Sequence, residues 1–421
     1  MEKRKPITVA EAVRRVMNAA GEGKREAVSI DQAYGRRLAQ DVVSTHPVPP
    51  FNRSPYDGFA IRAEDSKLAS RENPVTFRVA GEIGAGQVFT GTLQEREAVR
   101  IMTGAQIPDD CDAIVMFELT AEHSEGGESF MTIKRPFASG DNVSFAGEDT
   151  EAGKVLVPKG SYINPGVMAL LATFGYHSVE VAQKPVVGVF ATGSELLDVH
   201  EELQPGKIRN SNAHMILAQI ERAGAEPLYL GKLPDQLDRC LSAVREALPQ
   251  VDMLITTGGV SVGDYDLLPD VYKEIGAEVL FNKVAMRPGS VTTVAKTKEK
   301  LLFGLSGNPS ACYVGFELFV RPVISHRFFD QKPHLKKAKA VLAEDFLKPN
   351  PFTRFVRSTL DIKDGCLHVD PSGFNKSNAV AVLAYTDVLM VLPGGTRGFR
   401  TGDMVDVLIL DAHEGSEWPW D

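Results

Sequence analysis

Three short segments rich in glycine, serine and threonine are places where backbone amides could bind an anion. They begin at Thr192, at Thr256 and at Ser306, and a helix after Pro309 would add its positive end to the third. One glycine loop would be weak evidence, because most are only turns. Three at one edge of a sheet predict a site for a phosphorylated, nucleotide-like ligand. The candidate ligand-binding residues in these loops are Thr192, Gly193, Thr257, Gly258, Gly259, Ser261, Gly307, Asn308 and Pro309.

Acidic residues beside these loops could hold a hard divalent cation. Glu195 follows the first loop, Asp235 follows a strand-like segment, and Asp264 and Asp266 end the second loop. Any one of them could merely cap a helix or lie in a solvated turn. Mg²⁺ prefers oxygen ligands and commonly bridges carboxylates to substrate phosphates. We therefore predict a Mg²⁺ site with Asp235 and Asp266 as the preferred ligands and Glu195 as a third.

A cationic segment contains Lys283 and Arg287, four residues apart, followed by the turn signal Pro288-Gly289. The two cations could form an ordinary surface pair. Beside loops that cradle an anion, a clamp for phosphate or another oxyanion is favoured.

Two segments nearer the N-terminus are also unusual. Asp57-Gly58 lies within Ser-Pro-Tyr-Asp-Gly-Phe-Ala, and Thr103 lies within Arg-Ile-Met-Thr-Gly-Ala. From the residues alone, each could equally be a plain or capped turn.

Composition excludes several classes of protein. The net charge of −9 argues against a protein that coats nucleic acid. The four cysteines are far apart without a Cys-x-x-Cys pair, and the nine histidines have no metal-ligand spacing. Nowhere do about 18 uncharged apolar residues follow one another. We expect a cytoplasmic protein without membrane spans or nucleic-acid partners.

The elements that must position these residues alternate between strands and helices from about Lys184 to Phe329. Strands are predicted at 186–190, 228–230, 253–256, 291–295 and 301–305, and helices at 212–223, 237–248 and 268–275. Such alternation predicts a mostly parallel sheet with helices on both faces. A ligand then belongs at the carboxyl ends of the strands, where the glycine-rich loops lie.

The flanking segments have other patterns. Thr8-x-x-Glu11 is a capping box that predicts an amphipathic helix ending near Gly21. From Pro47 to Arg135 the pattern is mostly β, and after Lys332 short strands return. Asp364-Gly365 is a hairpin signal that favours a small C-terminal β barrel. We expect the acidic tail containing Trp418 and Trp420 to be frayed.

At these motifs the sequence resembles the molybdopterin molybdenumtransferases, the bacterial MoeA type and the C-terminal domain of gephyrin, over essentially the whole chain. The matching motifs occur in the family's order: Ser-Pro-Tyr-Asp57-Gly-Phe-Ala, Arg-Ile-Met-Thr103-Gly-Ala, Ala-Gly-Glu-Asp149, Thr-Gly-Ser-Glu195-Leu, Thr-Gly-Gly-Val-Ser-Val-Gly-Asp-Tyr-Asp266 and Ser-Gly-Asn308-Pro. Their joint occurrence is specific, whereas Thr-Gly-Gly alone also appears in molybdopterin adenylyltransferases and competence-damage proteins.

The resemblance implies a multidomain α/β protein. It would contain an elongated N-terminal α+β dimerisation region (1–50 and 141–182), a β-rich module (51–140), a central three-layer α/β/α molybdopterin-binding domain (183–330) and a C-terminal β barrel (334–421). The implied reaction inserts molybdenum from molybdate into adenylyl-molybdopterin, releases AMP and uses Mg²⁺. The implied assembly is a homodimer in which the β-rich module of one subunit faces the α/β domain of the other. Molybdopterin adenylyltransferase and molybdoenzyme maturation proteins are candidate partners.

The resemblance also assigns roles to residues. Its catalytic set is Asp57, Thr103, Asp149, Glu195, Lys283 and Arg287, and in the barrel Arg357 and Ser377 match polar positions directed towards the cleft. These cations and hydroxyls could hold oxyanions while a carboxylate orients the attacking water. Either Glu195 or Asp149 could be that carboxylate.

Four residues depart from the family's usual pattern: Arg287 and Ser290 stand where lysines are common, Ser144 where arginine is frequent, and Ser306 where proline is usual. Since an arginine fork grips an oxyanion differently from a lysine, the choice between molybdate and tungstate stays open.

Two alternatives belong to other classes of protein. A non-catalytic molybdopterin-binding scaffold would not need the acidic residues, which are intact. A molybdopterin adenylyltransferase would lack the roughly 180 residues before and 90 after the α/β domain.

Overall fold

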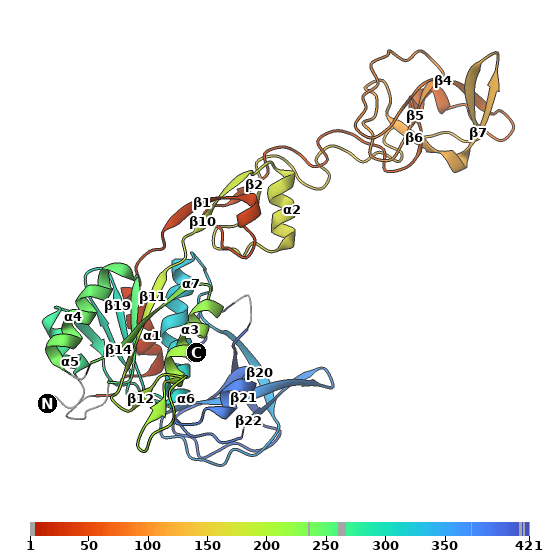
Figure 1. The fold of residues 1–421 in the computed structure, drawn as a ribbon. Helices are drawn as coiled ribbons and strands as arrows, with labels where there is room; N and C mark the ends of the chain where they lie inside the picture. The colour runs from red at the N-terminus through yellow and green to blue at the C-terminus, as the bar shows by residue number, and fades with distance from the viewer. Residues whose placement is uncertain are drawn as a thin grey trace. The chain divides into compact units, whose positions relative to one another are not determined.

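The computed structural model describes residues 5–234, 236–259, 267–371, 373–411, 415 and 417–420 (Figure 1). The chain divides into two compact units. The first comprises Met1–Gln40, Lys159–Met168 and Ser178–Asp421, and the second Asp41–Pro158 and Ala169–His177.

A six-stranded sheet forms the centre of the first unit. Its strands, in spatial order, are β14 (Glu226–Leu233), β11 (Val186–Thr192), β15 (Met253–Thr257), β19 (Leu301–Leu305), β18 (Thr293–Lys296) and β16 (Glu278–Phe281). Every neighbouring pair from β14 to β19 is parallel, and β18 alone runs against its two neighbours. The predicted mostly parallel sheet is confirmed.

Helices cover both faces of this sheet (Figure 1). One face carries α1 (Val9–Ala19), α3 (Ser211–Arg222), α6 (Pro309–Gly315), a π-helical turn (Phe316–Val320) and α7 (Arg321–Arg327). The other face carries α4 (Leu237–Ala247) and α5 (Leu268–Glu274). Buried aliphatic and aromatic residues fill the space between the layers, so the predicted three-layer α/β/α architecture is confirmed.

Helix α1 begins where its capping box predicts. The hydroxyl of Thr8 accepts a hydrogen bond from the backbone N–H of Glu11 at 3.2 Å, which satisfies one of the helix's free amides. Val9, Val13 and Val16 are buried in the core of the α/β sheet. Strand β1 (Arg25–Ser29) then pairs antiparallel with β10 (Ser178–Ala182).

The C-terminal strands form a closed five-stranded barrel. They are β20 (Lys336–Leu342), β21 (Thr353–Lys363), β22 (Cys366–Pro371), β23 (Val388–Leu392) and β24 (Met404–Ile409), and the pairing of β21 with β23 closes the ring. Asp364 and Gly365, both with positive φ, form the predicted hairpin turn. The short strand β17 (Met286–Arg287) pairs with β21 and so joins the α/β domain to the barrel.

The expectation of a frayed C-terminal tail is wrong for its last described residues. Trp420 packs against the main core, with its ring 6.2 Å from that of Phe355. Trp418 lies edge-on to His334, at 5.7 Å between ring centroids. Partial burial of Trp420 and these ring contacts hold the segment against the fold, although its local composition is polar and acidic.

The second unit contains a mostly antiparallel six-stranded sheet. Its spatial order is β6 (Ala113–Met116), β3 (Gly58–Ile61), β5 (Glu97–Ile101), β4 (Val75–Ile83), β8 (Glu128–Ile133) and β7 (Thr120–Glu125). A further small pairing joins β2 (Val42–Val43) to β9 (Val155–Val157).

The remaining elements are short. They are α2 (Pro165–Thr173), β12 (Leu196–Leu197), β13 (Ile208–Arg209) and 3₁₀ turns at Ile30–Gln32, Ala63–Ser66, Phe117–Leu119, Leu248–Gln250 and Ala381–Tyr385. No helix in the described part of the chain is both long and apolar enough to cross a membrane.

Candidate oxyanion and phosphate site

The described parts of the three glycine-rich loops meet at one edge of the central sheet, as the sequence predicts. They follow the neighbouring parallel strands β11, β15 and β19. The hydroxyl of Thr192 donates to the backbone oxygen of Thr257 at 3.2 Å, which links the first loop to the second. A Cβ atom on Gly258 would lie 3.9 Å from the Cα of Gly307, so the second and third loops are also in contact.

Gly258 occupies a place that no other residue fits. Its φ is +105°, which side chains rarely adopt, and an added Cβ would lie 2.6 Å from the hydroxyl oxygen of Thr192. Its N–H donates to the carbonyl of Leu305 at 2.8 Å. The turn after β15 is therefore tied to both adjacent strands. The hydroxyl of the preceding residue, Thr257, is buried and has no hydrogen-bond partner within the described ranges.

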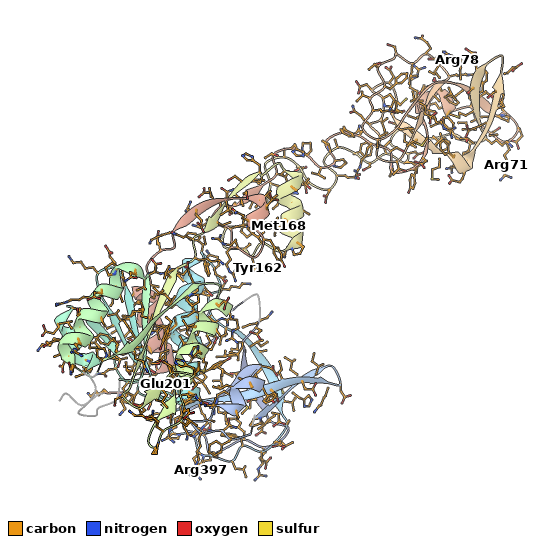
Figure 2. All side chains as sticks on the ribbon, in the orientation of Figure 1. Arg71, Arg78, Tyr162, Met168, Glu201 and Arg397 are labelled. Carbon is orange, nitrogen blue, oxygen red and sulfur yellow. The ribbon has the colours of Figure 1, made fainter. Side chains whose placement is uncertain are left out.

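The first loop folds the carboxylate of Glu195 over Gly193. A Cβ on Gly193 would clash with both carboxylate oxygens of Glu195. Lys207 fixes the loop from outside, donating to the carbonyl of Ser194 at 2.5 Å. The segment between β12 and β13 contains Glu201 (Figure 2), whose carbonyl accepts from Arg209 at 3.0 Å.

The third loop is shaped by hydrogen bonds from its own residues and from α3. The side-chain amide of Asn212 donates to the carbonyl of Gly307 at 2.8 Å. The hydroxyl of Ser306 accepts from the N–H of Asn308 at 3.2 Å. Serine at 306 thus supplies a hydrogen bond that the proline usual in the family would not.

A segment of the barrel is fastened to the start of α6. The N–H of Ser310 donates to the carbonyl of Ser377 at 3.0 Å, and its hydroxyl donates to that of Ala379 at 2.7 Å. Ser310 is fully buried. These bonds hold Ser377 beside the third glycine-rich loop.

A cavity of about 580 Å³ lies between this loop and the barrel. It brings together six of the residues singled out from sequence, namely Arg287, Ser290, Ser306, Asn308, Arg357 and Ser377. The β17–β21 pairing carries Arg287 to the barrel, and this pairing could not be seen in the sequence.

The cavity is strongly cationic. Its charged lining residues within the described ranges are Arg287, Lys348, Arg354, Arg357 and Lys376, and no carboxylate is among them. Burial, together with the neighbouring charge of Arg354, lowers the pKa of Arg357 to about 10. Uncompensated buried charge is costly, so this arrangement is suited to an anionic ligand. Lys348, Arg354 and Lys376 were not predicted from the sequence.

In the second unit, Asp57 and Thr103 are in direct contact. The carboxylate of Asp57 accepts from the N–H of Thr103 at 2.7 Å and from its hydroxyl at 2.9 Å. These bonds lower the pKa of Asp57, because they stabilise its ionised form. Two residues 46 positions apart in the sequence therefore form one structural feature.

Removing the hydroxyl of residue 103 is expected to raise the pKa of Asp57. Thr103→Val deletes the side-chain donor and leaves the backbone donor, so the carboxylate will protonate at a higher pH than in the unchanged protein. A carbon-13 NMR titration of the Asp57 carboxyl measures this change. An unchanged midpoint would show that the hydroxyl does not stabilise the carboxylate, and Thr120→Val is a control in the same unit.

The loop that carries Asp149 lies beside the segment that precedes Asp57. Arg53 forms backbone bridges both to Gln106 and to Ser144. The hydroxyl of buried Ser144 bonds to the carboxylate of Glu148, and the N–H of Asp149 donates to the carbonyl of Val48 at 3.0 Å. Asp149 itself is exposed.

Of the other predicted residues, one lies away from the cavity and four fall outside the described part of the chain. Lys283 does not line it; its backbone carbonyl accepts from the N–H of Ile7 at 3.2 Å. Asp235, Ser261, Asp264 and Asp266 lie outside the described residues. Within the described ranges, no three histidines, cysteines or carboxylates come together to hold a metal ion.

Three family models match the chain in sequence order. They are the MoeA N-terminal region (domain I and II) at 7–175, a probable molybdopterin binding domain at 188–326 and the MoeA C-terminal region (domain IV) at 339–410. The three-layer domain, the barrel and the glycine-rich edge between them are thus those of a molybdopterin-binding protein of the MoeA type.

Relatives make the assignment more specific. The chain is 58% identical to a molybdopterin molybdenumtransferase of Bacillus subtilis, covering 100% of this chain and 98% of that protein. A Staphylococcus epidermidis protein with the same name is 50% identical, with 99% of each covered. A Pyrococcus horikosii molybdopterin biosynthesis MoeA protein matches in structure with a TM-score of 0.86 at 30% identity, over 97% of this chain and 100% of that one. The chain belongs to the molybdopterin molybdenumtransferase family. The predicted role as a transferase of molybdenum cofactor biosynthesis is confirmed, and the scaffold alternative is not favoured.

Proposed function

We propose that this protein inserts molybdenum from molybdate into adenylyl-molybdopterin and releases AMP. The observation that carries the proposal is the cationic cavity, which adjoins a glycine-rich loop and is lined by Arg287, Arg357 and Ser377. A tetrahedral oxyanion suits a site with several guanidinium groups and no carboxylate among its described lining residues. The adjoining loops suit the phosphates of the second substrate.

We assign the oxyanion to Arg287, Arg357 and Ser377, and the phosphates to the loops that contain Thr192, Gly258 and Asn308. Water then attacks a phosphorus atom of the pyrophosphate, and the bridging P–O bond breaks to leave AMP. The proton of that water passes to a carboxylate. Glu195 and Asp149 are the two candidates, and Lys283 remains a further candidate for contact with the leaving phosphate.

Asp57, Thr103 and Asp149 belong to the second unit, and we propose that a homodimer brings them to the site of the other subunit. The hydrogen bonds that keep Asp57 ionised support a role in orienting a cationic or hydrogen-bond-donating group. We further propose that the chain has four structural parts. They comprise residues 1–50 with 141–182, 51–140, 183–330 and 334–421.

Molybdopterin adenylyltransferase and molybdoenzyme maturation proteins are the partners that we propose.

A magnesium requirement rests on donor chemistry. Glu195, Asp235 and Asp266 offer the oxygen ligands that Mg²⁺ prefers, and of these only Glu195 is described. When bound, Mg²⁺ would screen the charge of the substrate phosphates. We place the protein in the cytoplasm, since its four cysteines, Cys111, Cys240, Cys312 and Cys366, are far apart in the sequence and include no Cys-x-x-Cys pair, as is common in proteins of a reducing compartment.

The proposed reaction predicts AMP release that depends on molybdate. Purified protein with adenylyl-molybdopterin, molybdate and Mg²⁺ should release AMP, and omitting molybdate or adding a chelator should reduce the rate at least tenfold. Chromatography of the nucleotide measures the product. Asp57→Asn, which removes a charge but little volume, should also lose activity. Failure of the folded wild-type protein to release AMP from intact substrate would refute the proposal.

A further inference from the structure

The cationic cavity contains further lining residues that the proposed oxyanion clamp does not use. Strand β21, which supplies Arg357 to the clamp, also contributes Arg354, and the loop before it contributes Phe346 and Lys348. The guanidinium of Arg354 lies 5.7 Å from the centroid of the Phe346 ring, and the ammonium of Lys348 lies 5.9 Å from it. These contacts hold two cations at the cavity wall by cation–π attraction.

Arg354 is oriented by a neutral buried residue. Its Nε donates to the side-chain oxygen of Asn350 at 2.5 Å. Asn350 is only 1% exposed, and its amide nitrogen donates to the hydroxyl of Thr396 at 3.0 Å. No carboxylate is among the described residues that line the cavity around Arg354. The fork is therefore fixed in direction while its charge stays uncompensated.

Two other guanidinium groups lie close to Arg354. Arg287 is its direct partner in the parallel β17–β21 register. Arg357 is 2% exposed, and its buried Nε has no hydrogen-bond partner in the described part of the chain. Burial and the charge of Arg287 lower the pKa of Arg354. Three like charges at one cavity, one with an unused buried donor, indicate a site completed by an anion.

We propose that Arg354 is a third oxyanion-binding residue, which holds a tetrahedral dianion together with Arg287 and Arg357. Asn350 is its positioning residue. This inference rests on the proposed function and refines its oxyanion site. Three positive charges at one cavity favour a dianion such as molybdate, tungstate or sulfate over a monoanion, because attraction grows with the charge of the ligand. Planar forks also match the oxygen pairs of a tetrahedral anion.

The test is direct binding of sodium molybdate to the full chain by calorimetry at constant ionic strength, without the pterin substrate. Arg354→Gln should weaken binding at least tenfold. Arg400→Gln is the matched control, because it removes the same charge from an exposed site of the barrel outside the cavity; its affinity should stay within twofold. Sodium sulfate should compete with molybdate, and sodium nitrate should not.

Arg354→Lys separates charge from geometry. Lysine keeps the charge but cannot form the hydrogen bond from Nε to Asn350. We therefore expect its affinity for molybdate to lie between that of the wild-type protein and that of Arg354→Gln. Equal affinity of Arg354→Gln and wild type would overturn the inference, as would absence of binding by wild type. Molybdate-dependent AMP release by wild type would leave the proposed function standing in that case. Conversely, the wild-type protein could bind molybdate, with weaker binding by Arg354→Gln, and yet release no AMP. That outcome would refute only the proposed function.

Discussion

Gly258→Ala is expected to abolish AMP release and to lower the free energy of unfolding of the α/β domain by about 2–4 kcal/mol. A side chain at a φ of +105° costs roughly 1–3 kcal/mol in backbone strain. The added methyl group would also lie 2.6 Å from the hydroxyl oxygen of Thr192, so one of the loops must move. That displacement removes the bond between Thr192 and Thr257 and opens the edge on which the phosphates are proposed to bind.

Gly231→Ala is a matched control for this substitution. Gly231 lies in the same sheet with a φ of +89°, but an added Cβ would meet no atom within 4 Å. Gly231→Ala should therefore introduce only backbone strain, which lowers the free energy of unfolding by about 1–2 kcal/mol, and the variant should keep its activity. Urea unfolding followed by circular dichroism measures stability, and AMP release measures activity. Equal activity of the two variants would contradict a role for close contact between the loops.

Local chemistry was sufficient to predict many, but not all, of the helices and strands of this fold. Thr8 and Glu11 mark the start of α1 because capping is satisfied within four residues. Asp364-Gly365 marks a hairpin because both residues tolerate positive φ. The alternation of strands and helices places Thr192, Thr257 and Leu305 at one sheet edge before any tertiary contact is known.

Long-range pairing was not predictable in the same way. Strand β17 consists of two residues, Met286 and Arg287, and only its partner β21, more than 60 residues later, makes it a strand. Without that pairing, nothing in the sequence places Arg354 beside Arg287. Trp420 was misjudged for a related reason, because its acidic neighbours suggest a solvated end while its partner Phe355 is distant in the sequence.

The stability of the site can be separated from its function at Arg357. Arg357→Met should raise the free energy of unfolding by about 1–2 kcal/mol while reducing molybdate binding at least tenfold. Lowering the pKa of a buried guanidinium from its ordinary value to about 10 corresponds to an unfavourable free energy of roughly 3 kcal/mol in the folded state. Methionine removes that cost at similar length. Methionine cannot donate the hydrogen bond that Arg357 gives to the carbonyl of Lys376. The loss of this bond reduces the gain in stability by about 1 kcal/mol.

The pH dependence provides the decisive check of this argument. Below pH 10 the side chain of Arg357 is charged in both the folded and the unfolded state, so the cost of burial is fully present. Above pH 10 the folded protein loses this proton before the unfolded chain does, and the cost of burial is progressively relieved. The stability advantage of Arg357→Met should therefore be constant from pH 7 to 9 and shrink above pH 10. Thermal melts across this range measure it, with Arg400→Met as the exposed control. If Arg357→Met is less stable than wild type at pH 8, the charge of Arg357 is compensated by a partner within the protein. The cavity would then have less need of an oxyanion to balance its charge.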